Sequence, residues 1–374
     1  MNRIIFAIIL VFFIFNCERN KIEIGYITWD PAYELETNDS VYFIDPYDAT
    51  VTFSDQIAIS DRGDVGIKLY NINSGKFIRK IGKRGRGPGE FQNIQGISVR
   101  EDSLFVLDVG LRRASVFLLD GTYVDSFTIE DYNMNYSSLE ITNDNKFLFY
   151  VDSQDMETAF FGHEYNSNFS VLESKFIKPS EIYENVSTTE FLFHGMSVGS
   201  VLKKSENEIL IAPLYYSGKI FHYKRDNSEN WELVNTISGF VENKIPNTVL
   251  DNDQGRKPDG VGMHALIPGN RYFVIYNNTT RGLFKIFDNQ YIHFTEMDYD
   301  GNRVFGFELF DMDLNLLGYN IIKSEEISLS GEPNFFDLFV LQVDSDDKIY
   351  VASREGGENT VKVFKLDKSK LEMK

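Results

Sequence analysis

The chain has 374 residues, of which 43% are hydrophobic, so it can build one large core or two ordinary ones and overall disorder is excluded. Its 32 Phe and 20 Tyr favour half-buried strands over solvated helices. A formal net charge of −19 would repel a phosphate backbone, which excludes nucleic acid as a partner.

The first sixteen residues differ in character from the rest of the chain. After Arg3, an unbroken apolar run extends from Ile4 to Phe15. This run is short for a bilayer core of roughly 30 Å, and it is typical of a secretory signal. We therefore predict that residues 1–16 are a signal peptide and take no part in the fold.

Cys17 follows directly and is the sole cysteine of the chain, so neither an intramolecular disulfide nor a cysteine-based metal site can form. Its position resembles that of the lipidated first residue of a bacterial lipoprotein. The resemblance implies export to the cell envelope, membrane contact through a lipid anchor only, and a tether over residues 17–24. The alternative is a signal peptide followed by an incidental cysteine.

One strand pattern recurs along the remainder of the sequence. Six short segments with apolar alternation begin at Gln56, Ser103, Lys146, Asn207, Asn270 and Asp347. Each is followed by two strands joined by a polar turn, most clearly in residues 67–81 and 114–129, where Ser-Gly and Asp-Gly suit a tight hairpin. An additional apolar stretch precedes each segment, such as "GISV" at Gly96, "MHALI" at Met263 and "LFVLQV" at Leu338.

This count of four strands in each of six units predicts the fold. Long amphipathic helices are missing, which excludes a doubly wound sheet, and a single sandwich does not need six similar units. We predict an all-β protein in which residues 25–374 form one six-bladed β-propeller of four-stranded antiparallel blades. Residues 277–302 are expected to be an inserted hairpin in the fifth blade. N-terminal strands near residues 21–29 or 41–45 are expected to complete the last sheet.

The glycine-rich stretch "IGKRGRGPGEF", residues 81–91, is interpreted as a connector between the first two blades. It lacks the G-x-x-x-x-G-K-[ST] order of a phosphate loop, and Glu90 stands where the dinucleotide fingerprint needs its third glycine. No helix follows that could bind a phosphate at its N-terminus. The glycines permit tight turns, and Phe91 is predicted to fill the space between blades.

Residues 81–124, from this connector through "GISVREDSLFVLD" to "GTYV", resemble the repeat of NHL-type propellers. With the signal peptide and Cys17, the single Gly-Pro-Gly-Glu-Phe turn resembles the TolB-like six-bladed propeller lipoproteins of Gram-negative envelopes. The specific match covers about residues 56–129, and the later units fit by pattern. This resemblance implies a fold and a cellular address, whereas functions in that family are largely unassigned.

Several residues are candidates for ligand binding. In the connector, Lys83, Arg84 and Arg86 beside Glu90 could hold a carboxylate or sulfate through bidentate contacts. The alternative is a solvated turn whose arginines pair with Glu90 and neighbouring acids.

Two histidines and two tyrosines complete the candidate set. His194 and His264 are expected at or just before inner strands, where they could face the central channel, or they are structural. Tyr215 and Tyr216 could form a stacking platform for sugar or peptide, although most aromatic side chains must belong to the core between blades.

The sequence shows no catalytic or metal-binding motif. The five histidines are far apart, the Asp-x-Asp turns do not continue as EF-hands, and Gly-x-Ser-x-Gly does not occur. We therefore predict a non-enzymatic module, with no cofactor, that binds a protein, peptide or carbohydrate at one propeller face. The alternative is a metal-dependent NHL-like enzyme of lactonase or lyase type, whose divalent metal is held in the central channel by residues from several blades.

Overall fold

The computed structural model describes residues 29–129, 135–141, 146–152, 160, 162–167, 171–178, 199–213, 218–225, 230–240, 247–250, 262–267, 270–275, 279–286, 290–299, 302–322, 338–355 and 358–366. Every regular element in these ranges is a β-strand. A search of the same ranges for a helix long and apolar enough to cross a membrane finds none. The predicted signal peptide and Cys17 lie outside the described residues.

The first two sheets are four-stranded, antiparallel and built in chain order. The first sheet contains β2 (Pro46–Val51), β3 (Gln56–Asp61), β4 (Gly66–Asn71) and β5 (Phe77–Ile81). The second contains β8 (Ile94–Arg100), β9 (Ser103–Asp108), β10 (Arg113–Leu118) and β11 (Tyr123–Thr128). A short parallel pair, β6 (Lys83–Arg84) and β7 (Glu90–Phe91), lies in the connector between them.

The third, fourth and fifth sheets repeat this arrangement. The third contains β12 (Asn135–Ile141), β13 (Phe147–Asp152), β14 (Gly162–Tyr165) and β15 (Leu172–Phe176). The fourth contains β16 (Ser200–Ser205), β17 (Glu208–Ala212), β18 (Lys219–Arg225) and β19 (Trp231–Ser238). The fifth contains β23 (Thr279–Lys285), β24 (Tyr291–Tyr299), β25 (Asn302–Phe310) and β26 (Leu316–Ile322).

The sixth sheet joins the two ends of the described chain. It contains β27 (Leu338–Val343), β28 (Lys348–Glu355) and β29 (Glu358–Leu366), and its outer strand is β1 (Trp29–Glu34) from the N-terminal side. The expected N-terminal contribution is thus confirmed, although the strand only begins at the last residue of the first proposed stretch, Trp29, and extends beyond it to Glu34. Phe43 adds an isolated bridge to Asn359.

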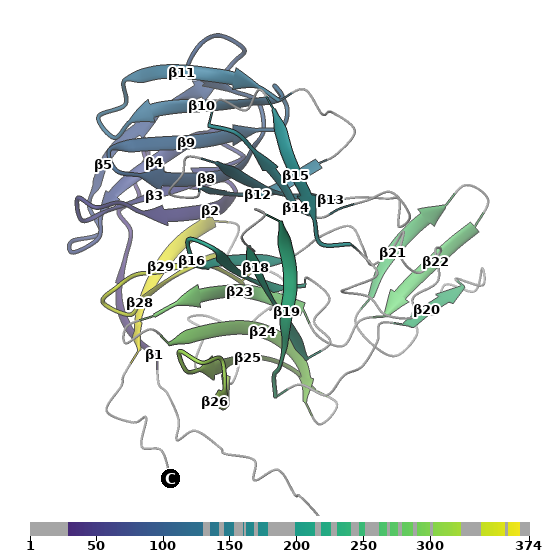
Figure 1. The fold of residues 1–374 in the computed structure, drawn as a ribbon. Helices are drawn as coiled ribbons and strands as arrows, with labels where there is room; N and C mark the ends of the chain where they lie inside the picture. Colours follow the sequence, from purple (N-terminus) through teal and green to yellow (C-terminus); the bar gives the residue numbers. More distant parts are fainter. Residues whose placement is uncertain are drawn as a thin grey trace, which may run out of the picture.

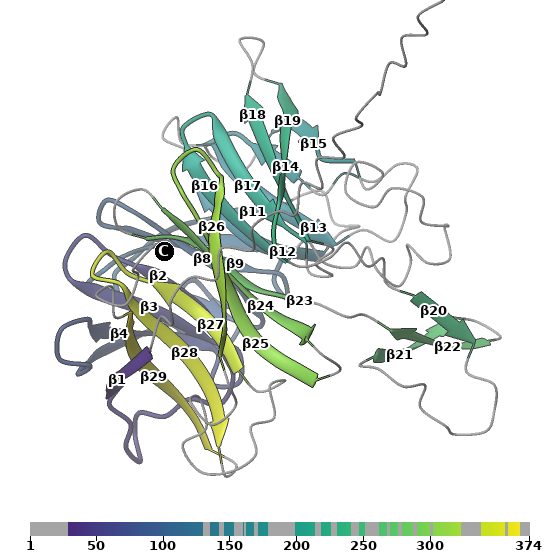
Figure 2. The same cartoon turned by 90° about the horizontal axis from the view of Figure 1, so that it is seen from below.

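The strand named first for each sheet above is its inner strand. Neighbouring inner strands contact one another in the order β2, β8, β12, β16, β23 and β27, and β27 contacts β2. Figures 1 and 2 show the sheets side by side around a common centre. The prediction of an all-β propeller with four-stranded antiparallel blades is confirmed.

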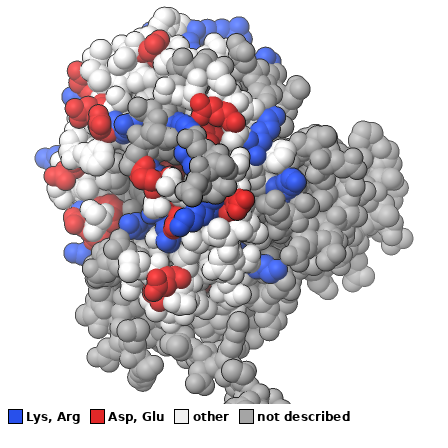
Figure 3. Space-filling model, viewed as in Figure 1, with Lys and Arg blue, Asp and Glu red and all other residues white. Residues whose placement is uncertain are grey.

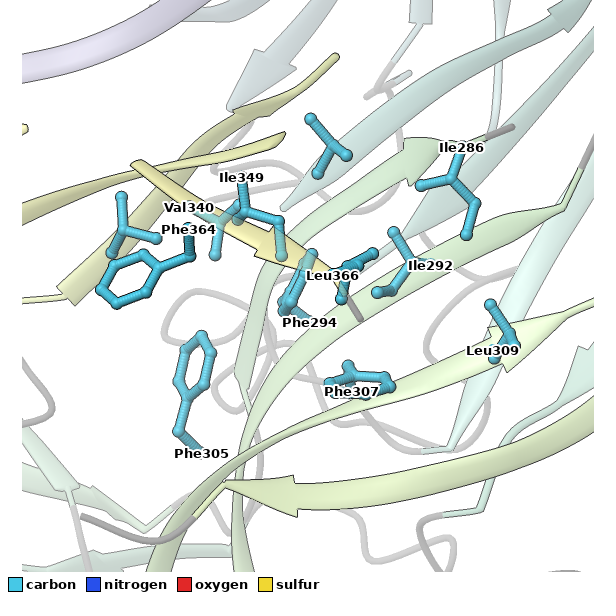
Figure 4. Close-up of a cluster of buried hydrophobic side chains, with 12 residues drawn as sticks. Ile286, Ile292, Phe294, Phe305, Phe307, Leu309, Val340, Ile349, Phe364 and Leu366 are labelled. Atoms are coloured by element: carbon cyan, nitrogen blue, oxygen red, sulfur yellow. The ribbon is translucent and has the colours of Figure 1, made fainter. Parts of the chain in front are cut away.

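The apolar core lies between successive sheets. Figure 4 shows the cluster between the fifth and sixth sheets, where Phe294, Phe305 and Phe307 face Ile349 and Phe364. Equivalent clusters lie between the sixth and first sheets and between the first and second. Each sheet therefore hides its flat sides against its neighbours, which accounts for the apolar alternation of most strands.

A three-stranded sheet stands apart from these sheets. It has the order β20 (Asn247–Leu250), β22 (Asn270–Ile275) and β21 (Gly262–Ile267), and both views show it away from the others. The strands predicted at Met263 and Asn270 as parts of the fifth blade belong to this sheet, so that assignment is wrong.

The expected insertion at residues 277–302 is also wrong, because this segment contributes β23 and β24 to the fifth sheet. The physical reason is the composition of β24. His293, Thr295 and Glu296 are fully buried in it beside the apolar Ile292 and Phe294, so polar side chains take positions inside the protein that are apolar in most other strands. The segment was recognised as a hairpin, and β23 and β24 do pair, but these polar positions concealed that the hairpin is the inner half of a blade.

Candidate functional site: the channel wall and the connector

Polar side chains link the inner strands around the central channel. Asp48 Oδ2 accepts a hydrogen bond from Ile97 N at 2.9 Å, which joins β2 to β8. Ser200 Oγ accepts from Leu283 N at 3.0 Å, which joins β16 to β23. Gln342 Nε2 donates to Ala49 O at 3.1 Å, which joins β27 to β2. In each case a polar side chain of one inner strand binds the backbone of the next inner strand.

Local backbone irregularity places two of these side chains. The pairing of β2 with β3 shifts between Pro46 and Asp48, and the pairing of β27 with β28 shifts between Val340 and Gln342. A β-bulge redirects the side chain that follows it. Asp48 and Gln342 thereby turn toward the neighbouring inner strand instead of the core of their own sheet.

Two carboxyl groups on this wall have raised pKa values. Burial raises the pKa of Asp48 to about 6, against the opposing effect of hydrogen bonds from Ile97 and Ala49. Burial likewise raises the pKa of Glu140, on β12, to about 7. The negative charge of Asp48 raises the Glu140 value further, and the Lys203 ammonium lowers it. The three side chains come from the first, third and fourth sheets and interact electrostatically.

Lys203 is held beside the third sheet by its own contacts. Its Nζ donates to Ile141 O at 3.3 Å and lies 3.4 Å from a carboxylate oxygen of Glu206. Asp48, Glu140 and Lys203 are each partly exposed. An enclosed set of two carboxyl groups and one ammonium can both donate and accept hydrogen bonds, which suits a polar ligand.

A buried hydroxyl, imidazole and carboxylate lie in a row in the fifth sheet. Thr280 Oγ1 is 3.1 Å from His293 Nε2, and His293 Nδ1 is 2.9 Å from Glu308 Oε2. His293 and Glu308 are directly opposite in the ladder, and both are fully buried. Sequence analysis missed this row because its members are spaced by strand pairing.

The row is arranged for linking sheets. Thr280 donates its single hydroxyl proton to Pro213 O at 2.6 Å, and Glu308 Oε1 accepts from Phe240 N at 2.5 Å. Pro213 follows β17 and Phe240 follows β19, so both ends of the row reach the fourth sheet. With its proton committed to Pro213 and only 5% of its surface exposed, Thr280 is not presented as a nucleophile.

The aspartates that end the second strands of the first two sheets fix the connectors. Asp61 accepts hydrogen bonds from Ile44 N and Asp45 N, both at 2.9 Å. Asp108 accepts from Gln92 N at 2.7 Å and Asn93 N at 3.1 Å. Both aspartates are fully buried. Because each one satisfies the backbone that leads into an inner strand, the Asp-terminated strand of the sequence repeat is a structural feature.

The glycine-rich connector runs between β5 and β8, as predicted. Glu90 Oε2 accepts hydrogen bonds from Gly87 N at 2.8 Å and Arg86 N at 3.0 Å. The Gly87 bond is the main cause that lowers the pKa of Glu90. The turn that sequence alone could suggest as a phosphate cradle is thus filled by its own carboxylate.

Two positions of the connector require glycine because neighbouring atoms leave no room for a side chain. A Cβ on Gly82, whose φ is +73°, would lie 2.1 Å from the Phe91 ring, and a Cβ on Gly85 would lie 2.1 Å from Glu90 Oε2. Phe91 is fully buried in the cluster between the first and second sheets, where it contributes to the same core as Ile67 and Val106. The predicted role of Phe91 as a filler between blades is confirmed.

The basic residues of the connector lie at its surface. The Lys83 side chain is 74% exposed and its Nζ is 3.4 Å from Glu90 Oε1, while Arg84 donates to Gly63 O at 3.0 Å. Arg86 is exposed, and its guanidinium forms no hydrogen bond or ion pair with the described residues. The structure therefore brings Lys83, Arg84, Arg86 and Glu90 together in one turn, and ligand binding there stays a prediction.

The other predicted site residues are not brought to this turn. His194, Tyr215 and Tyr216 lie outside the described residues. His264 lies in β21 of the separate three-stranded sheet, so its expected place at an inner strand of the ring is wrong. The channel residues Asp48, Glu140 and Lys203 were missed, and because the strands PYDATV, NYSSLEI and SVLKKS carry other polar residues, no signal in the sequence singles these three out.

Charged side chains of both signs occur on the described part of the chain. Figure 3 shows acidic and basic side chains interspersed on the visible described surface, with no continuous field of one sign. Within the described ranges, no group of three or more His, Cys, Asp and Glu side chains is placed to hold a metal ion. The predicted turn at Asp344 is an Asx-type turn, in which its Oδ1 accepts from Asp346 N and Lys348 N.

Comparisons with known proteins agree with this architecture. The family model described as "Domain of unknown function (DUF4934)" matches residues 34–328. No curated protein sequence gives a significant match.

Two solved structures share the fold. A DUF4221 family member from Bacteroides vulgatus ATCC 8482 is 9% identical, with a TM-score of 0.62 over 93% of this chain and 99% of that one. A Bacteroides fragilis NCTC 9343 protein whose name proposes that it is exported is 12% identical, with a TM-score of 0.56 over 91% and 94% of the two chains. At these identities the likeness concerns the fold alone.

Proposed function

We propose a function from the premise that the chain belongs to the DUF4934 family, a domain family of unknown function. The protein is an exported, lipid-anchored propeller of six blades that binds a polar ligand in its central channel without transforming it. The observation that carries this proposal is the enclosed set of Asp48, Glu140 and Lys203 on three inner strands.

The number of blades is supported by sheet topology and by the contacts of the inner strands. Six four-stranded sheets occur among the described residues, and the sixth takes β1 as its outer strand. The contacts of the inner strands return from β27 to β2 without involving the three-stranded sheet. An experimental structure with five or seven blades would contradict the assignment.

Export and anchoring are supported by the apolar run that precedes Cys17. A structural neighbour whose name proposes export adds weak support. We expect the full chain, expressed in a Gram-negative host, to fractionate with membranes and to incorporate labelled fatty acid, and the Cys17→Ser variant to lose both properties. Unchanged membrane association of Cys17→Ser would contradict the lipid anchor.

The channel wall favours an uncharged or zwitterionic ligand over a simple ion. A carboxyl group with a pKa of about 7, which burial gives Glu140, exists partly as the neutral acid at physiological pH, so it can donate as well as accept hydrogen bonds. Lys203 adds a cationic donor at the same place. Hydroxyl-rich sugars and peptide backbones present the complementary groups, in line with a carbohydrate or peptide ligand.

Ligand binding is tested with a soluble protein that begins at residue 21, which contains every described strand. A panel of neutral oligosaccharides and short peptides is screened by thermal shift and calorimetry. We expect a binding member of the panel to lose at least tenfold in affinity for Lys203→Met and for Glu140→Gln, and to keep its affinity for the exposed control Lys76→Met. Equal binding by all three variants would contradict the channel as the site.

The second candidate function is a metal-dependent enzyme with its centre in the channel. It is favoured by the convergence of Asp48 and Glu140 from different sheets, since channel metal sites of propellers need ligands from several blades. Elemental analysis of the purified protein distinguishes the two candidates. A stoichiometric divalent metal, lost with chelator and with Asp48→Asn, would favour the enzyme over the binding module.

A further inference from the structure

The two ends of the ring are formed by different loops of each sheet. Asp61 and Asp108, at the ends of β3 and β9, bind the connectors that lead into β2 and β8. The turns between inner and second strands lie at the other ends of β3 and β9. One end of the ring therefore carries the connectors, and the other carries the inner hairpin turns.

The connector end of the first two sheets carries a group of exposed cations. We call Lys83, Arg84, Arg86 and Arg112 the basic rim, and all four are exposed. Arg84 reaches Gly63 O, in the turn after β3, and Arg112 lies in the turn after β9, whose Val109 N donates to Asn93 O of the connector. The four cations thus lie along one connector and the two turns that flank it.

Acidic side chains near the basic rim are already engaged. Asp64 lies 3.0 Å from Lys68 Nζ and 2.8 Å from Lys80 Nζ, and Glu90 is bound by its own turn. Glu90 balances Lys83, at 3.4 Å, and the exposed guanidinium groups of Arg84 and Arg86 remain as positive charge at this end of a protein with a net charge of −19. Exposed arginines suit a carboxylate, which they bind through two parallel hydrogen bonds.

The hairpin end has the opposite character and receives the N-terminal segment. Trp29 pairs with Leu366, and Leu366 N donates to Asp347 O in the turn between β27 and β28. Exposed acids are carried by four inner hairpin turns: Asp55, Glu101, Asp102, Glu206 and Asp346. The segment from Cys17 thus enters at the end of the ring remote from the basic rim, and its eleven intervening residues span at most about 40 Å.

We propose that the basic rim is a docking surface for an acidic segment of a partner protein. The inference rests on the proposed lipid anchor at Cys17, which would hold the hairpin end toward the membrane and present the rim to the surrounding compartment. The partner chemistry is a run of Asp or Glu, bound through Arg84 and Arg86, with Lys83 and Arg112 at the margin.

The test uses the soluble protein from residue 21 and a fluorescein-labelled decamer of glutamate, with a glutamine decamer as the reference probe. Fluorescence anisotropy at low salt is expected to show saturable binding of the glutamate probe, weakened by added salt. The double variant Arg84→Glu/Arg86→Glu is expected to bind at least tenfold more weakly. The control Lys76→Glu/Lys178→Glu changes the net charge equally at exposed lysines elsewhere and is expected to bind as the unmodified protein does.

Three binding results would overturn the proposal. These are equal loss of binding in the control, no preference for the glutamate over the glutamine probe, or rim-dependent binding to vesicles containing phosphatidylglycerol in place of the peptide. Rim-dependent self-association in sedimentation experiments would instead identify a second copy as the occupant, and would also overturn it. Neither the Lys203 nor the Cys17 experiment depends on these outcomes, so failure of the rim is separable from failure of the channel or of the anchor.

Discussion

The second and fifth sheets build the same four-stranded unit from different interiors. In the second sheet, Leu104, Val106 and Phe117 pack against the connector residue Phe91. In the fifth, fully buried His293, Thr295, Glu296 and Glu308 lie on β24 and β25 beside the phenylalanines of the core. A propeller sheet can therefore be stabilised by apolar packing or by a network of hydrogen-bonded polar side chains. Of the two, apolar packing is the one that leaves a periodic pattern of hydrophobic residues in the sequence.

Removing a partner from the polar interior is expected to have the largest effect on stability. Glu308→Ala would remove the carboxylate that binds both the His293 ring and Phe240 N inside the protein. Breaking a buried charged pair typically costs about 3–5 kcal/mol, so we expect urea-induced unfolding to show a loss of about that size. The exposed control Glu232→Ala on β19 should change the free energy of unfolding by less than about 0.5 kcal/mol.

Glu308→Gln sharpens this comparison because it keeps the shape of the side chain and one acceptor oxygen. A loss between those of the control and Glu308→Ala is expected. If Glu308→Ala behaved like Glu232→Ala, the row from Thr280 to Glu308 would not stabilise the junction of the fourth and fifth sheets.

The same contrast explains what the sequence could and could not predict. The second strand of the first sheet, Gln56–Asp61, shows clear apolar alternation and was placed correctly. Asn270–Ile275 has the same appearance but lies outside the ring, because local alternation reports a pleated sheet and not which sheet it joins. The segment of β23 and β24 was recognised as a hairpin, but its buried polar side chains concealed its place inside the fifth sheet.

Site residues were predictable only where they were close in sequence. Lys83, Arg84, Arg86 and Glu90 share one turn, so a motif revealed them together. Asp48, Glu140 and Lys203 come from three different sheets, and no spacing along the chain encodes their convergence at the channel. A ring assembles its centre from residues that are far apart in the sequence.

The aspartate at the end of β9 offers a second, smaller test in the apolar region. Asp108 accepts hydrogen bonds from Gln92 N, Asn93 N and Leu111 N. Asp108→Ala would leave these donors without their acceptor, and we expect a loss of about 1.5–3 kcal/mol in the free energy of unfolding. Asp102→Ala, at an exposed turn of the same sheet, is the matched control and should stay within about 0.5 kcal/mol.

Hydrogen exchange locates this effect. We expect Asp108→Ala to reduce protection of the connector amides at residues 92 and 93, while the amides of the fifth sheet keep theirs. Uniform loss of protection over both sheets would show that Asp108 stabilises the whole ring and not the connector alone.

The smallest expected effect concerns Asp48 in the channel wall. Burial raises the pKa of Asp48 from 3.8 to about 6, so between these values the folded protein retains a proton that the unfolded chain has released. The contribution of Asp48 to stability therefore falls as the pH rises from about 4 to 6. Asp48→Asn removes this titration while its amide oxygen can still accept from Ile97 N.

We expect Asp48→Asn to match the unmodified protein near pH 4 and to exceed it by about 1–2 kcal/mol above pH 6, a modest gain because the carboxyl is partly exposed. Glu140, whose pKa is raised to about 7, titrates in both proteins, so the informative quantity is the difference between their pH profiles. The control variant Asp55→Asn, at the exposed turn after β2, should have the same pH profile of stability as the unmodified protein. Parallel profiles for Asp48→Asn and the unmodified protein would mean that the channel carboxyl is solvated as fully as a surface residue, which would also weaken the argument for a polar ligand site there.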